Sequence, residues 1–135
     1  MKKILSILLL SVMLWSSVIP AAAALPDNQV TPLWEQINTI TNRISFNDTT
    51  GYVDCSIQGD SGTTVVANIR IFKQTASGGW SIIKTNSASS TTRTLTFGTD
   101  FTAVSGTYYK AVLTVFVAKD DNVETVTKTT YKTCP

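Results

Sequence analysis

The chain has 135 residues, of which 43% are hydrophobic and 15% charged, and it contains no histidine. This length allows one small domain rather than two. Without imidazole the sequence lacks the commonest general base, the commonest zinc ligand and every Ser-His or Cys-His nucleophile arrangement. The formal charge of +2 includes two lysines at the very start, and the other basic residues are scattered, which argues against a nucleic-acid-binding face.

The first 24 residues have the pattern of a secretory signal peptide. One Met and two Lys precede a largely apolar run at 4–19, and small residues at Ala22 and Ala24 suit a signal peptidase. The apolar run is short for a membrane span. We therefore expect a cleaved signal peptide at 1–24, an extended segment at 25–33, one domain at 34–135, and a secreted, extracellular protein with no stable membrane span.

The remaining sequence alternates apolar and polar residues in short stretches separated by Gly, Asp, Asn and Ser. Thr and β-branched residues, which favour strands, dominate these stretches. One helical turn is the most that 33–40 would allow, because Thr and Asn are poor helix formers. We expect seven strands, at 37–46, 52–58, 63–75, 80–85, 91–97, 107–118 and 123–132.

The connections carry turn signals. Gly59-Asp60-Ser61-Gly62 predicts a hairpin between the second and third strands, 86–90 a Ser-rich loop, and 98–106 a longer connection that crosses between two sheets. Seven strands at this spacing are typical of a sandwich. The expected fold is all-β, a single antiparallel immunoglobulin-like or fibronectin-like sandwich of about seven strands.

Alternation also assigns side chains to the two faces of each strand. It places Val53, Cys55 and Ile57 together on the core face of the second strand. In the strand at 107–118 it places Tyr109 in the core and Tyr108 on the outer face. The same reasoning places Val65, Ala67, Ile69 and Ile71 inward on the third strand, and Leu95 and Phe97 inward on the fifth.

Cys55 and Cys134 are the only cysteines. Export places them where oxidation is favoured, and the last strand would bring Cys134 back towards the second strand. We therefore expect one intramolecular disulfide, which would contribute at most about 4 to 5 kcal/mol for a loop of this length.

Gly106-Thr107-Tyr108-Tyr109 resembles the start of the sixth strand of immunoglobulin-type domains. In that alignment Lys110 occupies the position of the strand's cysteine, and no Trp follows Cys55 at the expected distance. The overall layout resembles small secreted bacterial proteins of unknown function, which implies a sandwich and no particular activity. The features that carry this second resemblance are Trp34, Gly79-Trp80, Tyr108-Tyr109, and a terminal Cys134 that pairs with Cys55.

The carboxylates offer two alternative sites. Asp54, Asp60, Asp100, Asp120, Asp121 and Glu124 could supply a glycosidase-like pair, but most lie in turns, where Asp is favoured by its local hydrogen bonds. Asp120-Asp121-Asn122 together with Glu124 could bind calcium, although the spacing lacks an Asp-x-Asp-x-Asp-Gly loop. Asn47-Asp48-Thr49 is a formal glycosylation sequon. We expect no catalytic site, no resident metal and no cofactor.

Exposed aromatic residues remain as candidates for function, because they offer rigid, amphipathic contact area. We expect a binding face that contains Trp80, Tyr108, Phe116 and Phe72, unless neighbouring strands cover it. The predicted function is a secreted, non-enzymatic binding or adhesion module that recognises an extracellular protein or glycan. The alternatives are a small secreted hydrolase or toxin that uses carboxylates, and a structural surface or matrix component that assembles through edge strands.

Overall fold

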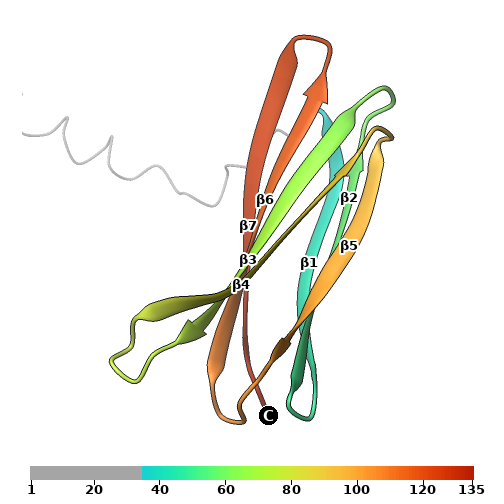
Figure 1. Cartoon of the computed structure of the whole chain (residues 1–135). Coiled ribbons are helices and arrows are strands. Elements are labelled where there is room, and N and C mark those ends of the chain that lie inside the picture. Colours follow the sequence, from blue (N-terminus) through green and yellow to red (C-terminus); the bar gives the residue numbers. More distant parts are fainter. Residues whose placement is uncertain (1–34) are drawn as a thin grey trace, which may run out of the picture. The chain divides into compact units, whose positions relative to one another are not determined.

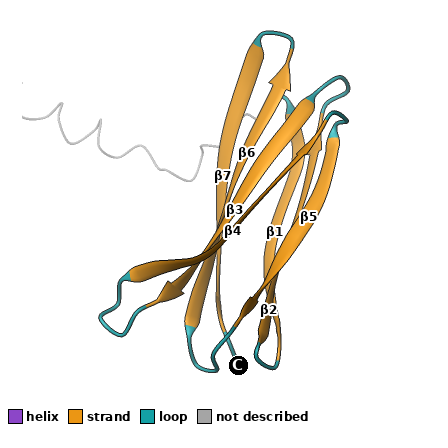
Figure 2. Cartoon of the chain, in the orientation of Figure 1, coloured by secondary structure: helices purple, strands orange, loops and turns teal. Residues whose placement is uncertain are grey.

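A computed structural model of the chain describes residues 35–135. The predicted signal peptide and the extended segment at 25–33 lie outside these residues. The described part consists of strands and loops (Figure 2), and within it no helix has the length and hydropathy needed to cross a membrane. The strands are β1 (Ile37–Asn47), β2 (Thr50–Gly59), β3 (Thr64–Gln74), β4 (Trp80–Ser90), β5 (Thr94–Thr102), β6 (Tyr108–Lys119) and β7 (Asn122–Thr133).

The strands form two sheets (Figure 1). One sheet has the order β1-β2-β5 and the other β4-β3-β6-β7, and every pairing is antiparallel. In constant-type immunoglobulin domains the fourth strand joins the sheet of the first, second and fifth strands. Here β4 pairs with β3 instead. The expected seven-strand antiparallel sandwich is confirmed, with its fourth strand on the opposite sheet from that of an immunoglobulin constant domain.

The core lies between the two sheets and follows the predicted alternation. The inward side chains of β2, β3 and β6 are almost completely buried, whereas their neighbours face solvent. Burial of each large aliphatic side chain contributes about 1.5–3 kcal/mol, so this cluster supplies most of the driving force for folding. The most deeply buried aliphatic side chains are Val53, Ile57, Val65, Ala67, Ile69, Ile71, Ala111, Leu113, Val115 and Val117.

Tyr109 links the core to the connection that precedes β6. Its ring packs against Phe101, with 5.1 Å between ring centroids, and its hydroxyl accepts a 2.9 Å hydrogen bond from the backbone N–H of Val104. This arrangement resembles the tyrosine corner of immunoglobulin-like domains, in which the tyrosine lies two residues before the strand's cysteine. On that resemblance the equivalent position is Ala111, which is buried, rather than Lys110.

The segment Gly59-Asp60-Ser61-Gly62 does not close a hairpin. β2 and β3 belong to different sheets, so this segment crosses from one sheet to the other. The buried hydroxyl of Thr63 donates a 2.7 Å hydrogen bond to the Asp60 carbonyl and stabilises the crossing. The prediction failed because the same turn residues serve tight hairpins and tight crossings, and only long-range pairing distinguishes them.

The predicted Ser-rich loop at 86–90 is strand. β4 continues to Ser90 as the edge strand of its sheet, where solvent tolerates polar side chains, and the Asn68 amide donates a 2.7 Å hydrogen bond to the Ser87 hydroxyl. β5 consequently begins and ends later than predicted. The crossing from β5 to β6 is confirmed, but it is confined to the residues between Thr102 and Tyr108.

A buried asparagine joins the two sheets near the edge formed by β1 and β7. Asn42 is 7% exposed, and its amide donates 3.0 Å hydrogen bonds to the carbonyls of Ala111 and Lys128. Its own side-chain oxygen accepts a hydrogen bond from the Cys55 thiol. Thr130 adds a 2.7 Å hydrogen bond to the Asn42 carbonyl. Because a buried amide is costly unless it is paired, these bonds fix the relative position of β1 and β7.

Candidate binding face

Four strands contribute side chains to one cluster on the outer face of the four-stranded sheet. This cluster, called the aromatic patch below, consists of Phe72 (β3), Trp80 (β4), Tyr108 and Lys110 (β6) and Tyr131 (β7). The register places Phe72, Lys110 and Tyr131 side by side on adjacent strands. Ring centroids lie 5.7 Å apart for Trp80 and Tyr108, 6.0 Å for Trp80 and Tyr131, and 5.8 Å for the two tyrosines.

A β-bulge places the Trp80 side chain on the same face as this patch. The pairing of β3 with β4 shifts by one residue, so that Ile71 lies opposite Lys84 but Phe72 lies opposite Ile82. With regular alternation Trp80 would share a face with Lys84, away from Phe72. The extra residue reverses this, and Trp80 and Ile82 join the outer face. β-Bulges commonly redirect side chains at functional sites.

Lys110 lies at the centre of the patch. Its Nζ atom is 4.4 Å from the centroid of the Trp80 ring and 4.7 Å from that of Phe72, and the Arg70 guanidinium carbon lies 5.9 Å from the Phe72 centroid. Both distances for Lys110 are within the range of favourable cation–π attraction. The patch therefore presents cationic groups among aromatic rings.

The patch is open to solvent. Tyr131 is 51% exposed and Tyr108 is 36% exposed, while Trp80 and Phe72 are half-buried by their neighbours. None of the seven described strands covers it. The outward positions of the sheet are otherwise occupied mainly by hydroxyl and amide side chains, among them Asn68, Gln74, Thr85, Ser87, Thr114, Thr125, Thr127, Thr129 and Thr133.

The structure unites three of the four predicted face residues. Trp80, Tyr108 and Phe72 belong to the patch, but Phe116 does not. Phe116 lies on the same outer face, as predicted, but it lies opposite Val66, about 27 Å of strand away from Tyr108 and therefore outside the patch. Alternation places all outward residues of a strand on one side without limiting their separation along it.

Sequence reasoning missed Tyr131. Alternation in the last strand places Thr125, Thr127, Thr129 and Tyr131 on one side. This pattern could have identified Tyr131 as an outward-facing aromatic residue. The pairing of Lys110 with Tyr131 also requires the two-residue turn at Asp120 and Asp121, which follows from the short Lys119–Asn122 connection.

The predicted disulfide is not formed, because Cys55 and Cys134 are both buried free thiols. Cys55 lies opposite Asn42 in the middle of the β1–β2 pair. Cys134 lies at the β1–β2 turn, with its sulfur 3.8 Å from the Asp48 carbonyl. About 20 Å of strand separates these two locations. Cys134 lies at the end of the sandwich that carries the β1–β2 turn (Figure 1), whereas Cys55 lies near the centre of β2.

Burial makes the Cys55 thiol inert. Desolvation, assisted by the negative charge of Asp54, raises the pKa of Cys55 to about 12. A thiol that stays protonated at neutral pH is neither a good nucleophile nor a good metal ligand. Its role is therefore packing and a hydrogen bond to Asn42.

The candidate calcium residues form a hairpin turn. Asp120 and Asp121 are the two turn residues between β6 and β7, and Asp120 has a positive φ of 53°. A Glu124 carboxylate oxygen accepts a 2.8 Å hydrogen bond from the backbone N–H of Gln36. Residues 35–135 contain no group of three or more His, Cys, Asp or Glu side chains placed to hold a metal ion.

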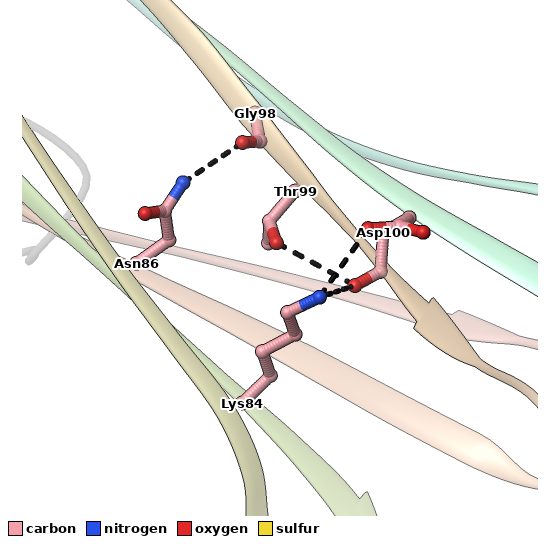
Figure 3. A network of polar contacts seen from close by, with 5 residues as sticks. All are labelled: Lys84, Asn86, Gly98, Thr99 and Asp100. Atoms are coloured by element: carbon pink, nitrogen blue, oxygen red, sulfur yellow. Dashed lines mark hydrogen bonds and ion pairs between the residues drawn. The ribbon is translucent and has the colours of Figure 1, made fainter.

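A groove of about 590 Å³ runs along the other open edge of the sandwich, between β4 and β5. Lys84 and Asp100 span it with a 3.3 Å ion pair, the only one among the described residues, and the Asn86 amide donates a 2.9 Å hydrogen bond to the Gly98 carbonyl (Figure 3). The hydrogen bond and charge of Lys84 lower the pKa of Asp100. A general acid needs a raised pKa, so Asp100 is poorly suited to that role.

The outer face of the three-stranded sheet carries a smaller hollow of about 350 Å³. Arg43 and Asp54 lie directly opposite each other there, next to Gly98, whose lack of a side chain leaves room for the Asp54 carboxylate. Tyr52, which is 40% exposed, is the only aromatic residue on this face. This face therefore has mixed charge and no aromatic cluster.

No protein-family model matches the sequence, and no curated protein matches it either. Among solved structures, a crystal structure of a protein from Archaeoglobus fulgidus is similar, with a TM-score of 0.34 and 9% sequence identity over 73% of this chain and 98% of that one. This likeness is too distant to carry an argument about function. The assignment of function depends on the chain's own residues.

Proposed function

We propose that this protein is a secreted, non-enzymatic binding module whose aromatic patch recognises an extracellular glycan or protein. The observation that carries the proposal is the convergence of Trp80, Tyr108 and Tyr131 from three different strands onto one exposed site. A cluster of this kind is energetically costly to leave in water and is common where ligands bind. Export is supported by the signal-peptide pattern of residues 1–24.

The geometry favours binding of an extended, flat ligand. The rings stand on hydrogen-bonded strands rather than on loops, so little conformational freedom is lost when a ligand stacks on them. The surrounding threonine hydroxyls can donate and accept hydrogen bonds with a polar ligand. Aromatic faces bordered by hydroxyl groups suit the amphipathic rings of sugars.

The test is affinity gel electrophoresis of the purified protein through gels that contain individual soluble polysaccharides, followed by calorimetry on any polymer that retards it. We expect Trp80→Ala to weaken binding about tenfold or more, as expected for an interface residue of this type. Tyr52→Ala is the matched control, because it removes an exposed aromatic ring from the other sheet. Equal loss in both variants, or no loss with Trp80→Ala, would remove the patch from the proposal.

The alternatives give different results in the same experiments. A hydrolase would shorten the polymer it binds and lose that activity with Asp54→Asn. A surface or matrix component would elute as a concentration-dependent assembly in size-exclusion chromatography without any added ligand. Stable retardation with no shortening of the polymer and a monomeric elution volume supports the binding module.

A further inference from the structure

The aromatic patch lies on a face with cationic side chains and no carboxylates. The four strands of this sheet are completely described, and their outward positions include Arg70 and Lys110 but no Asp or Glu. The carboxylates of residues 35–135 lie instead in turns, at the sheet edges and on the three-stranded sheet. This face therefore attracts anions, even though the chain from residue 25 onward has equal numbers of acidic and basic residues.

The two cations are close neighbours with no anionic partner. Arg70 lies opposite Val112, and Lys110 lies opposite Phe72, so Arg70 and Lys110 occupy diagonal positions about 7–8 Å apart on the same face. Neither forms an ion pair within the described part of the chain. Like charges placed side by side repel each other, and the aromatic rings offset this only in part. An anion bound between them would relieve the repulsion.

The position of Lys110 connects this charge to the stacking surface. Its ammonium group is held between the Trp80 and Phe72 rings, so an anionic group that reaches it must belong to a ligand that also contacts the aromatic patch. Charge-assisted hydrogen bonds to a carboxylate are among the strongest polar contacts. A ligand that combines flat apolar ring faces, hydroxyl groups and regularly placed carboxylates would use every feature of the patch.

We propose that the ligand of the aromatic patch is an acidic polysaccharide, a polymer of sugars that carry carboxylate groups. The inference rests on the proposed function, since it names the ligand class of the same site. Sugar rings stack on Trp80, Tyr108 and Tyr131, and a carboxylate pairs with Lys110 and Arg70. The threonines of β7 border this path and provide hydroxyl groups for the sugar hydroxyls.

Single-stranded nucleic acid also combines stacking with negative charge, but it fits this face less well. Proteins that bind it use a groove of cations that follows the phosphate backbone from one nucleotide to the next. This face has two cations, and the outward positions of β7 beside the patch are threonines. The cationic charge is confined to one point on the face, which suits pairing with a carboxylate of a sugar chain but not with a run of consecutive phosphates.

The experiment compares polymers that share a backbone. Binding of the purified protein to polygalacturonate is measured by calorimetry beside fully methyl-esterified polygalacturonate, in which the carboxylates are neutral, and a single-stranded oligothymidylate. Hyaluronan and alginate are included as two further acidic polysaccharides. We expect the acid form to bind about tenfold more tightly than the ester, with an affinity that falls as salt is added.

Two substitutions test the cations. Arg70→Gln and Lys110→Gln should each weaken binding to the acid form about fivefold or more, and Arg70→Gln should leave binding to the ester nearly unchanged. Arg43→Gln, on the three-stranded sheet, is the matched control and should have no effect. Arg70 lies beside the aromatic patch without belonging to it, so Arg70→Gln remains informative if Lys110→Gln disturbs the packing of the rings.

The outcomes separate this inference from the proposed function. Equal binding of acid and ester that Trp80→Ala abolishes would overturn the inference and leave the binding module intact. Binding to none of the three acidic polysaccharides, tighter binding of oligothymidylate, or an equal effect of Arg43→Gln would also overturn it. Binding that Trp80→Ala does not change would overturn both.

Discussion

Tyr108 and Tyr109 are neighbours in the sequence, yet they belong to two different regions of the molecule. Tyr109 is completely buried and holds the β5–β6 crossing through its hydroxyl, whereas Tyr108 is 36% exposed and lies in the aromatic patch. The inner face of the four-stranded sheet is apolar and closely packed, and its outer face is aromatic, cationic and hydroxyl-rich. The comparison teaches that alternation lets one strand serve two roles, with core packing on one side and the proposed binding on the other. It follows that inward substitutions should cost stability and outward substitutions should cost binding.

The largest effect on stability is expected from Tyr109→Ala. It removes a buried ring and the hydrogen bond to Val104, and we expect it to lower the free energy of unfolding by about 3–5 kcal/mol. Tyr108→Ala is the neighbouring control and should cost about 1 kcal/mol or less. Urea unfolding followed by circular dichroism measures both. Similar midpoints for the two variants would contradict the division of the strand into two faces.

A smaller loss is expected from Asn42→Ala, which removes the amide that joins the two sheets. The carbonyls of Ala111 and Lys128 would lose a buried partner, so we expect a loss of about 2–4 kcal/mol. Asn38→Ala, which removes a single long hydrogen bond at an exposed position, is the control. If both variants unfold at the same urea concentration, the buried amide does not hold the sheets together.

The Cys55 thiol predicts how stability depends on pH. Burial raises the pKa of Cys55 to about 12 in the folded state, above its ordinary value of 9.0. The contribution of the protonated thiol to the free energy of unfolding is therefore complete below about pH 9 and is lost as the pH rises towards 12. Cys55→Ala should therefore lose less stability between about pH 8 and about pH 10.5 than the unmodified protein does. Urea unfolding at both pH values measures this difference. An equal loss of stability in Cys55→Ala and in the unmodified protein would mean that the thiol ionises as easily in the folded state as in the unfolded state.

The free thiols give a related expectation. Because Cys55 and Cys134 do not pair, a reducing agent should leave the unfolding midpoint unchanged, and a thiol reagent should modify both residues only after unfolding. Mass spectrometry of the alkylated protein counts the modified cysteines. A mass that is two protons lower before reduction would show a disulfide and contradict this arrangement.

The smallest effect is expected at the exposed ion pair between β4 and β5. Lys84→Met should leave the unfolding midpoint almost unchanged, because exposed pairs contribute little. It should still raise the pKa of Asp100 towards the ordinary value, since the Lys84 hydrogen bond is the main cause of the lowered pKa. An NMR titration of the Asp100 carboxyl carbon measures the pKa. A pKa that stays low in the variant would show that another group is responsible.

Local patterns were sufficient for much of the fold. Alternation located seven strands and the inward positions of Val53, Ile69 and Tyr109, because the period of a strand depends only on the backbone. The pairing between strands that are distant in the sequence could not be predicted from these local patterns. The turn at Gly59 to Gly62 proved to be a crossing, and Cys134 lay at the β1–β2 turn rather than beside Cys55, since both depend on which strands share a sheet.

The candidate site shows the same limit. Trp80, Tyr108 and Phe72 could be named from the sequence as outward or turn-flanking aromatics. Their contact depends on the bulge in β4 and on the pairing of β6 with β7, which also adds Tyr131. The one-residue bulge could not be detected from the sequence, because apolar and polar residues do not alternate clearly in Trp80-Ser81-Ile82-Ile83. Phe116 lies on the predicted face but outside the patch, because the pattern carries no information on distance along the strand.

The most direct test of the central claim is an NMR titration of the isotope-labelled protein with short oligogalacturonates. We predict that the backbone amides of Phe72, Trp80, Tyr108 and Tyr131, together with the Trp80 indole N–H, shift as ligand is added, while those of Arg43, Tyr52 and Asp54 remain in place. Shifts confined to the three-stranded sheet would contradict the assignment of the outer face of the four-stranded sheet as the binding surface.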